Sequence, residues 1–109
     1  MNNKTLSILS YVTIIGWLIS FFQYKDAPKN SLVSYHLRQG FGIFIVIFIF
    51  NIVLSIVTRI VPVLGLLGLV GFVLSLIFII MGIINAANEQ EKPVPLIGSL
   101  FVGKFNFIP

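Results

Sequence analysis

The sequence predicts an all-α membrane protein with three transmembrane helices and a short C-terminal helix that is interfacial or re-entrant. No charged residue occurs within residues 5–24, 39–58 or 61–88. A helix crosses the hydrocarbon core of a bilayer in about 20 residues, at about 1.5 Å per residue. Each of the three uncharged intervals is therefore long enough to hold one transmembrane helix.

The composition also favours a bilayer over water as the solvent. Of the 109 residues, 58% are hydrophobic and 9% are charged, whereas an ordinary soluble domain is about 25% charged. A chain of this length cannot bury so much apolar surface in one core. The seven basic residues are scattered singly, which is typical of residues that flank membrane spans and not of a nucleic-acid site. We therefore expect one integral membrane domain over residues 1–109.

The first element is predicted as a membrane span over residues 5–22. Its far end is crowded with aromatic residues, as in the belts at membrane interfaces: Trp17, Phe21, Phe22 and Tyr24. A cleavable signal peptide that begins with Lys4 is the alternative. Because the apolar run is longer than a usual signal-peptide core and no Ala-x-Ala-like cleavage site follows it, we interpret the segment as a retained span.

The second and third spans are predicted as an antiparallel hairpin. A helix is expected to begin near residue 31 and to cross the membrane over residues 40–60. This helix would be about 43 Å long against a hydrocarbon core of about 30 Å, so that it must protrude or tilt. Pro62 suits the first turn of the next span, which covers residues 63–87 and ends before Pro93.

The tail is apolar but too short to span. We expect an interfacial helix over residues 95–104, with a re-entrant segment packed against the bundle as the alternative. With three spans, the first loop and the tail share one side and hold most of the basic residues: Lys25, Lys29, Arg38, Lys92 and Lys104. The positive-inside rule then predicts a multi-pass plasma (inner) membrane protein with its N-terminus outside and its C-terminus in the cytoplasm.

Small residues line one face of the third span, and polar residues line one face of the second. The small residues are Gly65, Gly68, Gly71, Ser75, Gly82 and Ala86. Such a face lets another helix approach closely. We favour packing against the first or second span; packing against another chain and no specific role are the alternatives.

The polar residues of the second span are Asn51, Ser55 and Thr58, at positions i, i+4 and i+7 of one helix face. An unpaired amide in mid-membrane is costly, so Asn51 needs a partner. Hydrogen bonding between helices is the preferred interpretation. The alternative is a water-lined path, which in three short spans would require a homo-oligomeric channel.

A polar cluster is expected where the second helix begins. His36 is the single histidine, and on the predicted topology Gln23, Gln39, Asn85 and Asn88 lie at the same membrane level. The nearby cations, Lys25, Lys29 and Arg38, would lie at the membrane surface, where each contributes about 1 kcal/mol of attraction to anionic lipid. A third hypothesis is that the first loop and the tail use these cations to engage anionic lipid or a soluble protein.

The sequence offers little for catalysis. Cysteine is absent, and the three acids, Asp26, Glu89 and Glu91, lie in loops or at a helix end. No Gly-x-Ser-x-Gly or phosphate-binding loop is present, and zinc would need three or four ligands. We therefore expect no catalytic residue, cofactor, metal or small-molecule substrate. The leading hypothesis is a non-enzymatic assembly or accessory subunit of a membrane complex, which contacts other membrane proteins or copies of itself; the homo-oligomeric channel is the alternative.

Two short motifs resemble those of a known family. Residues 34–40 (Ser-Tyr-His-Leu-Arg-Gln-Gly) resemble the start of the second helix in bacterial membrane proteins related to the Tic-twenty component of the chloroplast inner-envelope import machinery. Residues 82–88 and 93–98 are similar to the closing pattern of that family, in which small residues precede a Pro-Leu-Ile-Gly-like segment. Some magnetosome membrane proteins belong to the same group.

The resemblance implies a small helical membrane protein that works through partners, and it implies no chemistry. His36 and Gln39 match the polar positions of the family's motif and are thereby candidate structural or interaction residues. The chain departs from the motif at Tyr35, where phenylalanine is usual, and at Gly40, where alanine is usual.

Overall fold

A computed structural model describes residues 2–95, 97–105, 107 and 108 of the chain. These residues form four α-helices and two short 3₁₀ helices, so the predicted all-helical fold is confirmed. In chain order the elements are α1 (Asn3–Val12), α2 (Ile14–Lys25), α3 (Ser31–Ile60), η1 (Pro62–Leu66), α4 (Leu67–Ala87) and η2 (Gly98–Phe101).

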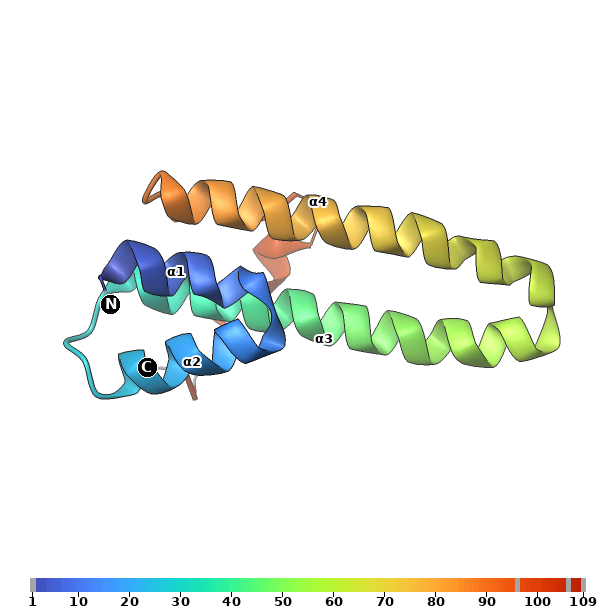
Figure 1. The fold of residues 1–109 in the computed structure, drawn as a ribbon, viewed down its shortest axis with the longest axis horizontal. Helices are drawn as coiled ribbons and strands as arrows, with labels where there is room; N and C mark the ends of the chain where they lie inside the picture. The colour runs from blue at the N-terminus through green and yellow to red at the C-terminus, as the bar shows by residue number, and fades with distance from the viewer. Residues whose placement is uncertain (1, 96, 106, 109) are drawn as a thin grey trace.

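The two long helices, α3 and α4, form an antiparallel hairpin that runs the length of a molecule of 50 × 24 × 22 Å (Figure 1). The side chain of Asn30 begins α3 by accepting from the backbone N–H groups of Leu32 and Val33. Val61 and η1 make the turn, with Pro62 at the start of η1. In the described part of the chain, two helical segments are long and apolar enough to cross a membrane, residues 31–60 and 62–87.

The expected continuous span over residues 5–22 is corrected by the structure, which interrupts it at Thr13. Thr13 has an extended backbone (φ −158°, ψ 174°) and its hydroxyl accepts from the backbone N–H of Gly16 at 3.1 Å, which begins α2. Helices α1 and α2 fold back against each other (Figure 1) and are only about 15 and 18 Å long. Neither can cross a bilayer, so a third crossing is not confirmed.

The α1–α2 hairpin covers only half of the long hairpin. It packs against the first turns of α3 and the last turns of α4. We call this half of the molecule the head. The head consists of α1, α2, residues 31–44 and 78–87, and the described residues after 87. The rest of the long hairpin, residues 45–77, projects beyond the head (Figure 1) and is called the arm. Large apolar side chains are exposed along the arm, including Phe48, Val53 and Leu69.

The tail differs from the expected helix over residues 95–104. A single 3₁₀ turn, η2, forms there, and the tail folds back along α3 instead of lying free as an amphipathic helix. Val94, Phe101 and Ile108 are all buried in the head, and the ring of Phe101 covers Gly42 of α3. The tail is therefore held by burial of these separated apolar side chains.

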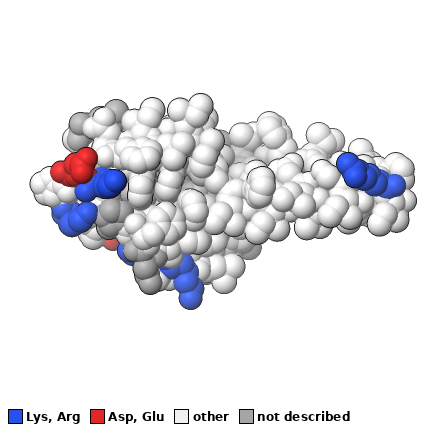
Figure 2. Space-filling model, turned by 90° about the horizontal axis from the view of Figure 1, so that it is seen from below, with Lys and Arg blue, Asp and Glu red and all other residues white. Residues whose placement is uncertain are grey.

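Charge is distributed unevenly along the long axis (Figure 2). Arg59 lies in the last turn of α3, at the tip of the arm, whereas the head holds the other basic residues: Lys4, Lys25, Lys29, Arg38, Lys92 and Lys104. Leu6 and Ile108 belong to one buried cluster, so both described ends of the chain lie in the head. The expected placement of the two termini on opposite sides depended on three crossings and loses its basis.

The small residues of η1 and α4 lie against other parts of the chain. A Cβ atom on Gly65 would touch Thr58, one on Gly68 would touch Leu54, and ones on Gly71 and Gly82 would overlap the rings of Phe50 and Tyr11. Ala86 is buried in the head, and the Ser75 hydroxyl donates to the Gly71 carbonyl at 2.7 Å. Four of these residues, Gly65, Gly68, Gly71 and Gly82, therefore lie against side chains of α3 or α1, whereas Ser75 bonds within its own helix.

Helix α1 approaches α3 closely at Gly40, because a Cβ atom there would overlap the carbonyl oxygen of Ser10. A backbone atom cannot move aside without moving α1. We therefore expect Gly40→Ala to lower the free energy of unfolding in detergent by about 1–3 kcal/mol, the usual cost of overpacking. Gly68→Ala is the matched control, since its Cβ would meet only the flexible end of Leu54, at 3.2 Å. Equal stability of the two variants would contradict this account of the α1–α3 contact.

Candidate functional site

A buried histidine links three parts of the head. The Nδ1 atom of His36 lies 2.6 Å from the Tyr11 hydroxyl, and its Nε2 atom lies 2.8 Å from the carbonyl oxygen of Gln90. A carbonyl can only accept, so Nε2 carries the proton and, in the neutral ring, Nδ1 accepts from Tyr11. Burial raises the pKa of Tyr11 well above its usual value, which keeps the phenol protonated as a donor. His36 thus joins α1 to the segment after α4.

Gln39 binds the same segment one turn further along α3. Its Nε2 atom donates to the carbonyl oxygen of Gly98 at 2.8 Å, and its Oε1 atom accepts from the backbone N–H of Val94 at 3.3 Å. Both tail groups and the amide are buried. An unpaired backbone group in such a place costs about 1–3 kcal/mol, so the single Gln39 side chain satisfies two tail groups that would otherwise destabilise the fold.

Asn85 completes this arrangement from the end of α4. Its Nδ2 atom donates to the Lys92 carbonyl at 3.2 Å, and its backbone carbonyl accepts from the Gln90 N–H at 2.8 Å. We call the four buried side chains Tyr11, His36, Gln39 and Asn85 the polar latch. Three of them bind backbone groups of residues 90–98 directly, and Tyr11 fixes the imidazole that binds Gln90.

The latch contains three of the five residues expected in a polar cluster: His36, Gln39 and Asn85. Gln23 and Asn88 are exposed and stand apart from it. Sequence reasoning missed Tyr11, which lies in the middle of an apolar run. A signal was present, because a buried tyrosine hydroxyl needs a hydrogen-bond partner and the chain offers one histidine.

Two aromatic residues expected in a membrane-interface belt lie instead in the core of the head. Trp17 and Tyr24 are 4% and 0% exposed. The indole Nε1 of Trp17 donates to the Leu37 carbonyl at 2.8 Å, and the Tyr24 hydroxyl accepts from the Asn30 N–H at 2.7 Å. The folding back of α2 along α3 brings these rings inside, which a straight first span would not have done.

Among the described residues, no hydrogen bond joins a polar side chain of the second span to another helix. The side chains of Asn51 and Ser55 are exposed on the arm and bond to the carbonyls of Ile47 and Asn51 in their own helix, both at 2.8 Å. Thr58 faces Gly65 near the turn. Of the membrane-surface cations, Lys29 and Arg38 line one cavity beside the tail, and Lys25 lies apart from that cavity.

In the described residues, no group of three or more histidine or acidic side chains is placed to hold a metal ion. The buried polar atoms of the latch instead contact one another and the backbone of the tail. An arrangement in which side chains bind the chain's own backbone positions a segment.

Fold and latch together define a small helical protein with a packed head and a two-helix apolar arm long enough to enter a membrane. A family model described as the magnetosome magnetite crystal formation protein family (MamF/MmsF) matches residues 2–101. The chain belongs to this family. No curated protein and no solved structure matches it, and the resemblance to the chloroplast import component gains no support.

If the polar latch holds the tail against α3, Gln39→Leu should let the tail detach from α3 more often. Because the chain has no cysteine, Val94→Cys places a single thiol at a site that is 2% exposed. We expect Gln39→Leu to speed maleimide labelling of that thiol by roughly tenfold, since about 1–3 kcal/mol of hydrogen bonding is lost.

Gln23→Leu is the matched control for this experiment, because it removes the same amide from an exposed position. It should leave the labelling rate unchanged. Equal rates in the Gln39 and Gln23 variants would show that the latch does not hold the tail.

Proposed function

We propose that the protein is a non-enzymatic integral membrane subunit that assembles with other copies of itself or with other proteins of the magnetosome membrane. Family membership supports a role connected with magnetite crystal formation. The latch supports a structural role, because its buried polar groups bind the chain's own tail. The arm supports a membrane location, since its exposed surface is almost wholly apolar.

The observation that carries assembly is the exposure of Asn51 on the arm. Its Nδ2 atom donates to Ile47 of its own helix, but no hydrogen bond to its Oδ1 atom occurs among the described residues. Asn51 borders a groove between α3 and α4 that is also lined by Gly68 and Ser75. Its side chain is nevertheless exposed, and Phe48 and Ile52 beside it are exposed and apolar, so in a bilayer the open side of this amide would face lipid. Polar side chains in such positions pair across helices, with about 0.6–2 kcal/mol per contact. A second helix over Asn51 would supply the missing donor.

The same exposure gives little support to the channel alternative. Asn51 and Ser55 are one turn apart and cover about 6 Å of the helix axis, whereas a pore must be lined through about 30 Å of hydrocarbon. Thr58, the third residue of the predicted polar face, packs toward Gly65. Helix pairing needs only one polar contact and fits this pattern better.

We further propose that the long axis lies across the bilayer, with both described ends of the chain on the cytoplasmic side. The molecule is 50 Å long, close to the about 40–45 Å of a bilayer with its interfaces. Six basic residues at the head against one at the arm tip support this orientation by the positive-inside rule. The α1–α2 turn then dips into the membrane from the head side, which gives the exposed Ile15 at the start of α2 a lipid environment.

The assembly proposal predicts that Asn51→Leu weakens association. In proteoliposomes with donor- and acceptor-labelled copies, we expect the variant to lose energy transfer, with roughly a threefold to thirtyfold weaker association from the loss of one interhelical hydrogen bond. Val53→Leu is the control, because it is exposed at nearly the same depth on the opposite side of α3. A wild-type protein that shows no energy transfer and no crosslinked partner would refute assembly.

The proposed orientation predicts the labelling of single cysteines in intact cells by a membrane-impermeant maleimide. Asn3→Cys and Ser99→Cys, both exposed in the head, should react only after the cells are opened. Val61→Cys, at the turn of the arm, should react in intact cells that have a permeable outer layer. Opposite behaviour of the Asn3 and Ser99 variants would restore a third crossing.

A further inference from the structure

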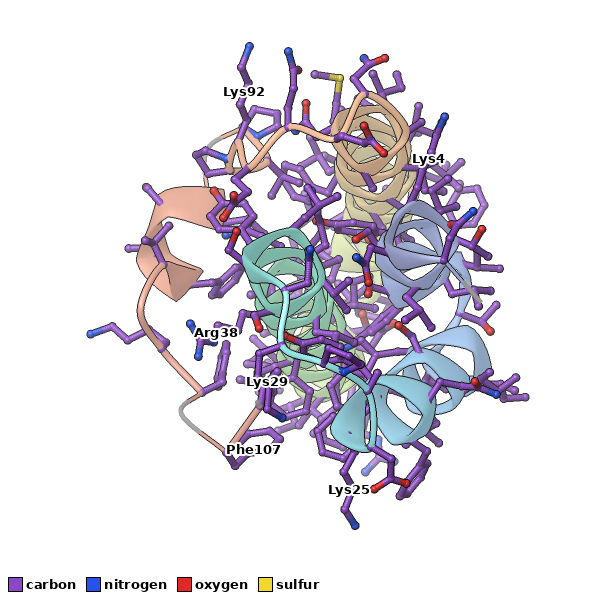
Figure 3. The ribbon with its side chains drawn as sticks, turned by 90° about the vertical axis from the view of Figure 1, so that its left-hand side faces the viewer. Lys4, Lys25, Lys29, Arg38, Lys92 and Phe107 are labelled. Atoms are coloured by element: carbon purple, nitrogen blue, oxygen red, sulfur yellow. The ribbon has the colours of Figure 1, made fainter. Side chains whose placement is uncertain are left out.

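A cavity of about 420 Å³ opens in the head between the first turns of α3 and the tail. Its polar wall includes Lys29, Ser34 and Arg38, and its apolar wall is formed by Phe101 and Val102. In Figure 3, Arg38 lies between α3 and the tail and Lys29 lies near it, whereas Lys25 points away. Two of the three cations expected at the membrane surface are therefore gathered at one concave site.

The guanidinium of Arg38 has hydrogen-bond donors that the described residues leave unsatisfied. Its Nε atom is buried and makes no hydrogen bond among the described residues, and its Nη2 atom reaches the Ile108 carbonyl at a long 3.4 Å. A buried guanidinium N–H without an acceptor is costly. The planar guanidinium of arginine matches the oxygens of carboxylates and phosphates. Arg38 also lines the cavity, so an anionic oxygen bound there would meet a guanidinium that the chain itself pairs only weakly.

The net charge of the residues around the cavity favours a singly charged anion over a doubly charged one. Lys29 and Arg38 contribute two positive charges, and Glu91, which accepts from the Ser31 hydroxyl at 3.0 Å, contributes one negative charge. The net of +1 fits a singly charged phosphodiester better than a phosphate monoester, which carries about −1.5 to −2. The apolar wall beside the cations fits the glycerol and acyl part of a lipid.

The level of the cavity agrees with this assignment. It lies beside residues 29–38, immediately before the uncharged stretch of α3 that begins at Gln39. On the proposed orientation, this is where lipid phosphates lie. We propose that the cavity is a binding site for the phosphodiester of an anionic phospholipid, held by Arg38 and Lys29. The proposal deepens the proposed membrane role and rests on it only for the depth of the site.

The test titrates the full chain in neutral detergent with dioctanoyl phosphatidylglycerol and follows binding by native mass spectrometry. We expect saturable binding that Arg38→Gln weakens by about tenfold or more, because a charge-assisted hydrogen bond is lost. Lys29→Gln, at an exposed position, should weaken it severalfold. Lys25→Gln is the matched control, since it removes the same charge from the same end of the molecule and should leave the affinity unchanged.

Two further ligands separate the sources of the phosphodiester. Dioctanoylglycerol has the chains without the phosphate and should bind far more weakly. Glycerophosphoglycerol has the headgroup without the chains, and weaker binding than that of the lipid would identify a lipid site. Equal binding of the headgroup and the lipid would overturn the lipid assignment and identify a soluble phosphodiester.

Two results would overturn the site itself. One is equal binding of dioctanoylglycerol and phosphatidylglycerol, which would show that the phosphate is not recognised. The other is an equal loss of affinity in Lys25→Gln and Lys29→Gln, which would indicate general charge attraction. Because Arg38 contacts the tail, the folding of its variant is checked by circular dichroism. If that variant unfolds, the affinity of the exposed Lys29 variant for the lipid decides the test. If the protein does not bind the lipid, the association that depends on Asn51 is unaffected, so the two proposals can fail independently.

Discussion

The fold of the head depends on the need of buried backbone groups for hydrogen-bond partners. The tail after α4 has little regular structure, yet Val94 and Gly98 are buried. Two residues of α3 supply hydrogen bonds to backbone groups of the tail. His36 binds the Gln90 carbonyl, and Gln39 binds Val94 and Gly98. Because the tail also contributes Phe101 and Ile108 to the two buried clusters, these few hydrogen bonds help to hold the apolar core together.

The long hairpin could be predicted from the sequence because its determinants are local. The uncharged length and the proline at the turn are both visible in the chain, and α3 occupies nearly the predicted residues. Membership of His36, Gln39 and Asn85 in one cluster was also predictable, since polar residues at the ends of adjacent apolar helices tend to meet.

The rest of the head could not be predicted, because it depends on one backbone conformation and on contacts distant in sequence. Hydropathy does not distinguish a threonine within a helix from one that ends it, and Thr13 ends α1. Once that break is in place, Tyr11 meets His36 and Trp17 meets Leu37. Gln23 and Asn88 were assigned to the same cluster by their depth in a three-span bundle, and both are exposed.

The break at Thr13 also bears on how such a chain enters a membrane during synthesis. A straight first span would require either Lys4 or Lys25 to be carried through the hydrocarbon, at about 2.5–3.5 kcal/mol for a lysine at its centre. Two half-length helices joined at Thr13 keep both lysines at the same end of the molecule. On the proposed orientation, the segment is then embedded from one side as a helical hairpin, without translocation of the amino terminus.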